Sequence, residues 1–157
     1  MIITSFDPGK ITGYATLIEK PLISGNPSGK YAILEVGEIF GLGTNPIPQS
    51  LTFLRDIIDA ADEVLCETVV IRKITLNRSG IETHGVIKSL ASERGKVFIE
   101  RNASYLQGIR KWPIILPPQF SRLTPHEKDA LFHVMVYVGV TNVEGVHINA
   151  HKISSTS

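Results

Sequence analysis

The chain has 157 residues, of which 43% are hydrophobic and 20% charged, and its formal net charge is +1. These values fit one folded domain with a full core and exclude a disordered or fibrous protein. The one cysteine, Cys66, excludes a disulfide framework and indicates a reducing, cytoplasmic compartment. We expect no signal peptide at the N-terminus and no membrane span, because the apolar run 130–140 is too short for a bilayer.

The charge is unevenly distributed along the chain. Residues 1–67 contain 4 basic and 9 acidic side chains, residues 68–124 contain 10 and 3, and residues 125–157 contain 2 and 3. A basic middle third suits a face that binds a polyanion such as nucleic acid. It suits a solvated helix surface equally well, and the sequence does not decide between the two.

The first forty residues predict three strands joined by short turns. Residues 2–7 are mostly apolar and end in Asp7, and Pro8-Gly9 then bends the chain. A second strand is expected over 13–20 and a third over 31–40, which together predict an antiparallel meander. An Asp before Pro-Gly is usually a turn former. At the edge of a sheet, however, its carboxylate can also approach a metal ion or a phosphate.

A second acidic residue lies in an unusual place. A helix is expected over 49–61, followed by a strand over 63–71 with Glu67 in its middle. A charge inside an apolar strand is costly unless it is paired or bound to a metal. If this strand lies parallel to the first strand after the helical crossover, Glu67 and Asp7 point to the same place.

The middle of the chain alternates basic loops with further elements. Residues 72–78 are expected as a basic loop and residues 112–125, with four prolines, as irregular structure. Ser79 and Glu82 have the spacing of a capping box, which assigns Glu82 a structural role. The other expected elements are a helix from this box to Gly95, a strand over 97–100 and a basic helix over 103–111.

The last helix has the clearest start in the chain. Thr124 is its expected N-cap, Pro125 its first residue, and Glu127 closes a capping box. From about Glu144 the chain is expected to fray. Three polar residues share one face of the helix at positions i, i+3 and i+7, namely His126, Asp129 and His133.

Three carboxylates could together bind metal. Asp7, Glu67 and Asp129 offer the hard oxygen ligands that suit Mg²⁺. Two such ions about 4 Å apart can stabilise the attacking and leaving oxygens of a phosphoryl displacement. Spacing alone slightly favours the alternative, in which these residues are an unrelated turn former, buried ion-pair partner and helix N-terminal acid.

These motifs carry a resemblance to a known family. In order and in spacing they resemble the RuvC family of Holliday junction resolvases, which belong to the RNase H-like nucleases, over about residues 1–140. The run 81–101 is similar in style to the short RuvC-like nucleases that bacteriophages encode. The residues that carry the resemblance are Asp7-Pro8-Gly9 with Thr12-Gly13-Tyr14, then Glu67, then His126-x-x-Asp129-Ala130-Leu131.

The resemblance implies a fold and a domain organisation. It implies an α/β protein with an RNase H-like fold, in which a five-stranded mixed sheet of order 3-2-1-4-5 is flanked by helices. The nuclease domain would cover residues 1–143 and a C-terminal tail would follow over 144–157. A homodimer in the cytoplasm, or in the host cytoplasm for a phage-encoded protein, is also implied.

The resemblance further implies a metal-dependent endonuclease that cleaves branched DNA. Its expected substrate is the four-way Holliday junction, hydrolysed by a two-metal mechanism with Mg²⁺, for which Mn²⁺ substitutes. Carried over by position, the metal-binding and catalytic residues are Asp7, Glu67, His126 and Asp129. The basic residues expected to bind the nucleic acid are Lys10, Arg72, Lys73, Arg78, Arg110 and Lys111.

Two departures from the family pattern keep alternatives open. The loop 69–73 lacks the aromatic residue that family members use near the junction crossover, and the segment 112–124 is shorter than usual. Both weaken the expectation of strict junction specificity more than that of nuclease chemistry. The alternatives are a broader nuclease for flaps, forks or RNA–DNA hybrids and a non-cleaving junction-binding protein. His126 is open between a metal ligand, a general base and a structural first-turn residue.

Overall fold

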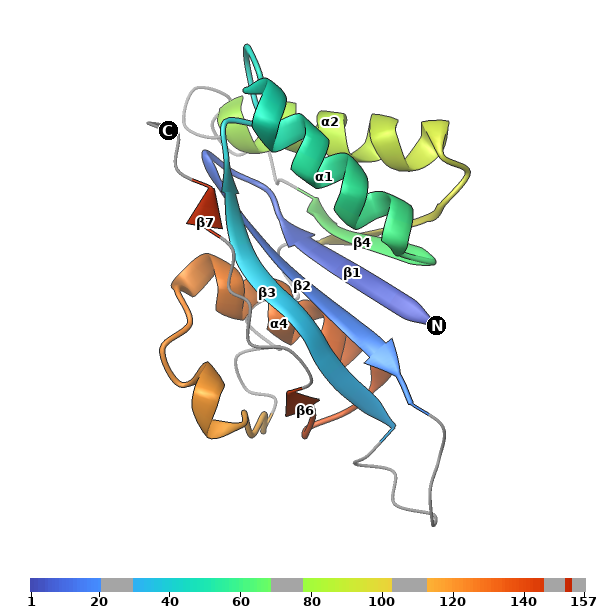
Figure 1. Ribbon diagram of the computed structural model, residues 1–157, viewed down its shortest axis with the longest axis vertical. Coiled ribbons are helices and arrows are strands. Elements are labelled where there is room, and N and C mark those ends of the chain that lie inside the picture. The colour runs from blue at the N-terminus through green and yellow to red at the C-terminus, as the bar shows by residue number, and fades with distance from the viewer. Residues whose placement is uncertain (21–29, 69–77, 103–112, 146–151, 154–157) are drawn as a thin grey trace.

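A mixed β-sheet runs through the centre of the computed structural model, which describes residues 1–20, 30–68, 78–102, 113–145 and 152–153 (Figure 1). The strands β1 (Ile2–Asp7), β2 (Ile11–Glu19) and β3 (Tyr31–Phe40) form the predicted antiparallel meander. β2 begins two residues earlier than expected. It pairs with β3 along its whole length.

Two parallel strands complete the predicted core of the sheet. β4 (Glu63–Thr68) pairs with β1, and β5 (Val97–Asn102) pairs with β4, both in parallel register. The chain reaches them through the helices α1 (Pro48–Ala60) and α2 (Arg78–Glu93), because parallel neighbours need a crossover. The order 3-2-1-4-5 is therefore confirmed.

Two short strands extend the sheet beyond this core. β6 (Glu144–Gly145) pairs with Ala32 and Ile33 of β3, and β7 (Lys152–Ile153) pairs with Glu38 and Ile39. The expectation of a frayed tail from Glu144 is wrong at these four positions. The outer edge of β3 presents unpaired backbone N–H and C=O groups, and the added strands satisfy part of them.

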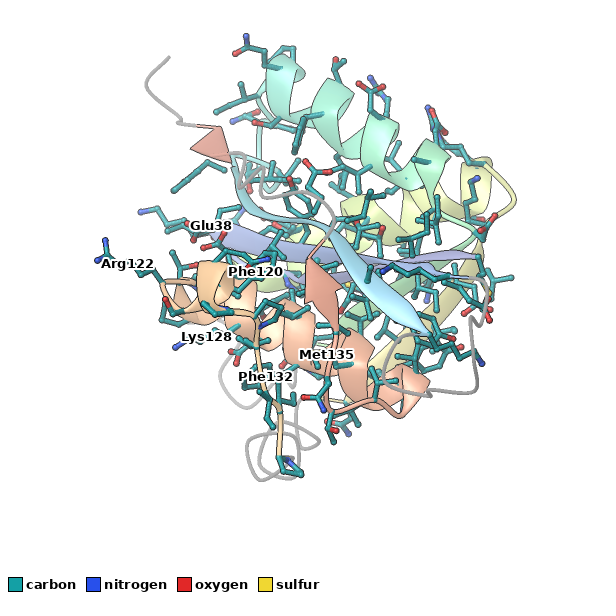
Figure 2. All side chains as sticks on the ribbon, turned by 60° about the horizontal axis from the view of Figure 1, so that its bottom comes forward. Glu38, Phe120, Arg122, Lys128, Phe132 and Met135 are labelled. Carbon is teal, nitrogen blue, oxygen red and sulfur yellow. The ribbon has the colours of Figure 1, made fainter. Side chains whose placement is uncertain are left out.

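Helices cover both faces of the sheet. α1 and α2 lie on one face, and α4 (Pro125–Val138) lies on the other, where Phe120 and Met135 belong to the same layer (Figures 1 and 2). The side chains of β1 alternate between the two layers, as period 2 requires. Phe6 packs in the apolar cluster that includes α1 and α2, and Ile3 in the cluster that includes α4.

Several local expectations differ from the structure. α2 begins at Arg78, so Ser79 lies inside the helix and the expected capping box does not form. Glu82 instead accepts a hydrogen bond from Arg78 Nε at 2.9 Å and another from the Thr44 hydroxyl. A short 3₁₀ helix, η2 (Pro118–Phe120), lies in the segment expected to be irregular, and β5 runs two residues further than expected.

Some expected elements cannot be compared with the structure. The end of the expected strand at 69–71, most of the basic loop and the expected helix 103–111 lie outside the described residues. Within the described part of the chain, no helix is long and apolar enough to cross a membrane.

The backbone of α4 approaches the sheet very closely at Gly13. This residue pairs with Asp7 of β1, and a Cβ atom built on it would overlap the carbonyl group of His126 and lie 2.9 Å from Glu127 N. Real Cβ atoms do not tolerate such distances, so only glycine allows this contact. The first turn of α4 thereby comes to lie directly over the end of β1.

We expect Gly13→Ala to destabilise the protein by about 3 kcal/mol, since the methyl group forces the α4 backbone away from β2. Gly85→Ala is the matched control, because a Cβ at Gly85 has nothing within 4 Å and lies inside α2. That control should stabilise the helix by roughly 0.5–1 kcal/mol. Urea unfolding of both variants measures the difference, and equal stabilities would contradict the backbone contact.

Candidate active site

The start of α4 is fixed by the capping box that the sequence predicts. The Thr124 hydroxyl accepts a hydrogen bond from Glu127 N at 3.3 Å, and Glu127 Oε1 accepts one from Thr124 N at 2.9 Å. Pro125 occupies the first helical position. These contacts satisfy two of the backbone donors that a helix start leaves open, and they set the direction in which the following side chains point.

Asp7 and His126 meet across the gap between sheet and helix. His126 Nδ1 lies 2.9 Å from Asp7 Oδ2, although the two residues are 119 positions apart in the sequence. The Asp7 side chain is only 15% exposed, whereas that of His126 is 43% exposed. The pair therefore has a buried carboxylate end and an imidazole that solvent and a substrate can reach.

Glu67 lies beside Asp7 on the neighbouring strand. β1 and β4 are in register up to Phe6 and Cys66, so Asp7 and Glu67 are the next residues of each strand. The predicted placement of these two carboxylates at the same edge is thus confirmed. Glu67 is buried, and its Oε2 atom lies 3.3 Å from His133 Nε2 of α4.

His133 is the residue of this site that the sequence reasoning missed. Its i+7 spacing from His126 was the available signal, but nothing in the sequence indicates which strand residue it would meet. The structure buries its side chain under α4, against Glu67.

Asp7 holds its proton unusually tightly. Burial raises the pKa of Asp7 from its usual 3.8 to about 7, the hydrogen bond from His126 opposes this rise, and the charges of Glu67 and Asp129 add to it. Asp129 is therefore close enough to Asp7 for its charge to act on that carboxyl group. Three carboxylates concentrate negative charge at one end of the sheet.

The donor set fits a hard divalent cation. Carboxylate oxygens suit Mg²⁺ and Mn²⁺, and such a cation would offset the burial and the neighbouring negative charges that together raise the pKa of Asp7. The Glu67 side chain is buried with its Oε2 atom facing His133 Nε2, which leaves its other oxygen, Oε1, as the one that can bind a cation. The side chains of the site form two pairs, Asp7 with His126 and Glu67 with His133. In the described part of the chain, no three acidic or histidine side chains are gathered as a preformed metal cluster.

Two of the predicted nucleic-acid-binding residues can be placed. Lys10 is exposed and lines a pocket of about 250 Å³ beside the turn that follows Asp7, and Arg78 is ion-paired with Glu82 at its rim. Two cations that were not predicted to bind nucleic acid, Arg122 and Lys128, are exposed near the start of α4 and extend outward (Figure 2). The other predicted residues, Arg72, Lys73, Arg110 and Lys111, lie outside the described residues.

Two solved structures of Thermus thermophilus RuvC share this fold. Thermus thermophilus RuvC in complex with a Holliday junction substrate is similar over 90% of this chain and 98% of its own, with a TM-score of 0.59 and 13% identity. A second Thermus thermophilus RuvC structure is similar over 98% and 86%, with a TM-score of 0.50 and 14% identity. Fowlpox virus resolvase with Holliday junction DNA reaches a TM-score of 0.44 at 20% identity, over 83% of each chain.

The predicted RNase H-like fold of the RuvC type is thereby confirmed. No protein-family model and no curated protein matches the sequence. At these identities the likeness establishes the fold, and the resemblance to the short phage-encoded type stays a prediction.

The raised pKa of Asp7 predicts how stability depends on pH without metal. The folded protein holds this proton more tightly than the unfolded chain, so the contribution is complete below about pH 4 and is lost as pH rises through about 7. Asp7→Asn cannot ionise and keeps that contribution. In EDTA, its stability advantage over the wild type should grow from near zero at pH 4 to at most about 4 kcal/mol at pH 8, at about 1.4 kcal/mol per tenfold change in acid dissociation constant.

Thermal or urea unfolding across this pH range measures the advantage. Asp56→Asn on the surface of α1 is the control and should show no such growth, since Asp56 is exposed to solvent. A constant difference between the wild type and Asp7→Asn would contradict the raised pKa.

Proposed function

We propose that this protein is a metal-dependent endonuclease that cleaves branched DNA, with the four-way Holliday junction as its preferred substrate. The observation that carries the proposal is the contact of Asp7 with His126, next to Glu67 on the adjoining strand. A carboxylate from the first strand, one from the fourth and a histidine from the last helix thus lie at one end of the sheet. Support also comes from Thermus thermophilus RuvC, which shares the fold and was solved with a Holliday junction substrate.

In this proposal Asp7, Glu67 and Asp129 hold Mg²⁺, for which Mn²⁺ can substitute. When bound, the metal polarises the scissile phosphate and stabilises charge on the attacking and leaving oxygens. The three side chains supply oxygen ligands from three separate elements, so the sheet and α4 must both be folded for the set to form. His126 completes the set on the solvent side, either as a further ligand or as a base.

His126 has the features of a proton acceptor for the attacking water. With its Nδ1–H donated to Asp7 Oδ2, the imidazole is held in one orientation and Nε2 keeps a free lone pair. The exposure of the ring leaves that atom accessible to the water and to the DNA backbone. Asp7 then has two tasks, because it orients the base and binds metal.

The DNA is held by basic residues around this end of the sheet. Lys10 and Arg78 lie on the α2 side, and Arg122 and Lys128 lie near the start of α4. Contacts with phosphates require no sequence recognition and give strongly salt-dependent binding. A symmetric junction suits a homodimer, in which each protomer cleaves one strand. The further residues proposed for this role are Arg72, Lys73, Arg110 and Lys111, with residues 1–143 as the nuclease domain.

The deciding experiment is a panel of labelled DNA substrates: four-way junction, fork, flap, RNA–DNA hybrid and linear duplex. We expect the wild type with Mg²⁺ to cleave the junction fastest. Comparable cleavage of flaps, forks or hybrids would support a broader nuclease instead. Binding of the junction without any cleavage would support a non-cleaving junction-binding protein.

The metal ligands can be tested on the same junction. Asp7→Asn, Glu67→Gln and Asp129→Asn should each lower the cleavage rate by at least about a thousandfold, because each removes a charged oxygen ligand. Their junction affinity should stay equal or increase, since negative charge facing phosphate is lost. Asp59→Asn, which removes one negative charge away from the site, should cleave like the wild type. If one of the three site variants also cleaves like the wild type, the residue replaced in it is not a metal ligand.

Substitution of His126 should lower the cleavage rate less than substitution of the carboxylates does. His126→Ala loses the proton acceptor and should cleave about 10²–10⁴ times more slowly. His126→Asp should retain more activity than the alanine variant with Mg²⁺ or Mn²⁺, because a carboxylate is a competent ligand and base at this position. Single-turnover cleavage of the junction measures both. Wild-type cleavage by His126→Ala would reduce His126 to a structural residue of the first helical turn.

A further inference from the structure

His133 is an ionisable side chain in an unusually closed environment. Its side chain is 2% exposed, and it lies on the buried face of α4 between the apolar residues Leu131 and Val134. A buried imidazole in an apolar layer needs a polar partner, because its ring nitrogens lose water on folding. The partner that the structure gives it is the carboxylate of Glu67, at 3.3 Å.

The contact is equally important for Glu67. The Glu67 side chain is 10% exposed and lies at the end of a strand whose neighbouring residues Leu65 and Cys66 are fully buried. Burying a carboxylate costs several kcal/mol unless it is paired or bound. Neither Glu67 Oε2 nor His133 Nε2 has a partner with hydrogen-bond geometry among the described residues. The two atoms therefore face each other at a distance that a small adjustment of either side chain converts into a hydrogen bond.

We propose that His133 is a positioning residue for the metal site. Its imidazole engages Glu67 Oε2, fixes the carboxylate against α4 and leaves the other oxygen, Oε1, to bind the metal. The inference rests on the proposed function, in which Glu67 is a ligand. It goes beyond that function by adding a residue that contacts neither substrate nor metal. Partners of this kind orient metal-binding carboxylates, and their loss typically lowers metal affinity 10- to 100-fold.

The i+7 spacing of His126 and His133 lets one helix contact both carboxylates. His126 at the start of α4 contacts Asp7, and His133 two turns later contacts Glu67. One helix thus holds both carboxylates of the adjoining strands β1 and β4. The separation between the two carboxylates then depends on the helix as well as on the sheet register.

The test measures Mn²⁺ binding directly, by the loss of the free-ion electron paramagnetic resonance signal, with the full chain at one fixed pH and without DNA. His133→Leu removes the donor while keeping an apolar side chain of similar size. His133→Gln places an N–H at a similar reach. Val134→Ala is the control, because it removes buried volume from the next position of the same helix. Thermal unfolding of each variant is recorded in parallel.

We expect His133→Leu to bind Mn²⁺ about 10- to 100-fold more weakly, and His133→Gln to return to within about threefold of the wild type. Val134→Ala should lower the melting temperature without changing Mn²⁺ affinity. In junction cleavage, His133→Leu should need a higher Mn²⁺ concentration for its half-maximal rate. Its rate at saturating Mn²⁺ should fall by a smaller factor than its Mn²⁺ affinity does.

Two results would overturn the inference. One is wild-type Mn²⁺ affinity in folded His133→Leu, and the other is a failure of His133→Gln to restore affinity. If His133→Leu does not fold, His133→Met provides the same apolar comparison with a more adaptable side chain. The proposed function fails separately, if the wild type binds no Mn²⁺ or if Glu67→Gln binds it as well as the wild type does.

Discussion

The backbone contact between Gly13 and the first turn of α4 is the constraint on which the rest of this structure depends. Asp7 and Gly13 are partners in adjacent strands, so whatever lies over Gly13 also lies beside Asp7. A side chain at this position would lift the helix, and His126 would then no longer reach the carboxylate. The capping box at Thr124 fixes where the helix begins, and the missing side chain of Gly13 fixes how near it comes.

The candidate site is energetically costly because it buries charged side chains. Both apolar layers pack closely along the sheet, but at one end Asp7 and Glu67 replace the hydrophobic residues that their strands otherwise carry. Burial and mutual repulsion raise the pKa of Asp7, which means that the folded protein without metal resists ionisation there. Residues that break the pattern of a strand in this way are expected at functional sites, where a ligand offsets the cost.

Much of the fold could be predicted from the sequence, because its signals are local. The alternation in β1 and β3, and the Thr124–Glu127 capping box, depend on neighbouring residues and were read correctly. The predicted start of α2 was wrong because Glu82 has competing hydrogen-bond partners, Arg78 and Thr44. Thr44 is 38 positions away in the sequence. β6 and β7 were missed because two residues carry no periodicity.

The candidate site shows the same division between local and distant information. The positions of Asp7 and Glu67 follow from strand pairing, and the resemblance to RuvC supplied His126 and Asp129. The contact of His133 with Glu67 could not be predicted, since it depends on the angle at which α4 crosses the sheet. That angle is set by packing of the whole apolar layer, and no single residue pattern in the helix encodes it.

The pairing of β6 and β7 with β3 has a consequence for how this protein behaves among other copies of itself. β3 is the longest strand of the sheet, with 10 residues, and its outer edge is covered near each end by these two strands. An uncovered strand of that length is a template for edge-to-edge association and aggregation. β6 and β7 therefore shield part of this edge, and a chain without these two strands would expose it to pairing with other chains on the side of the sheet away from β5.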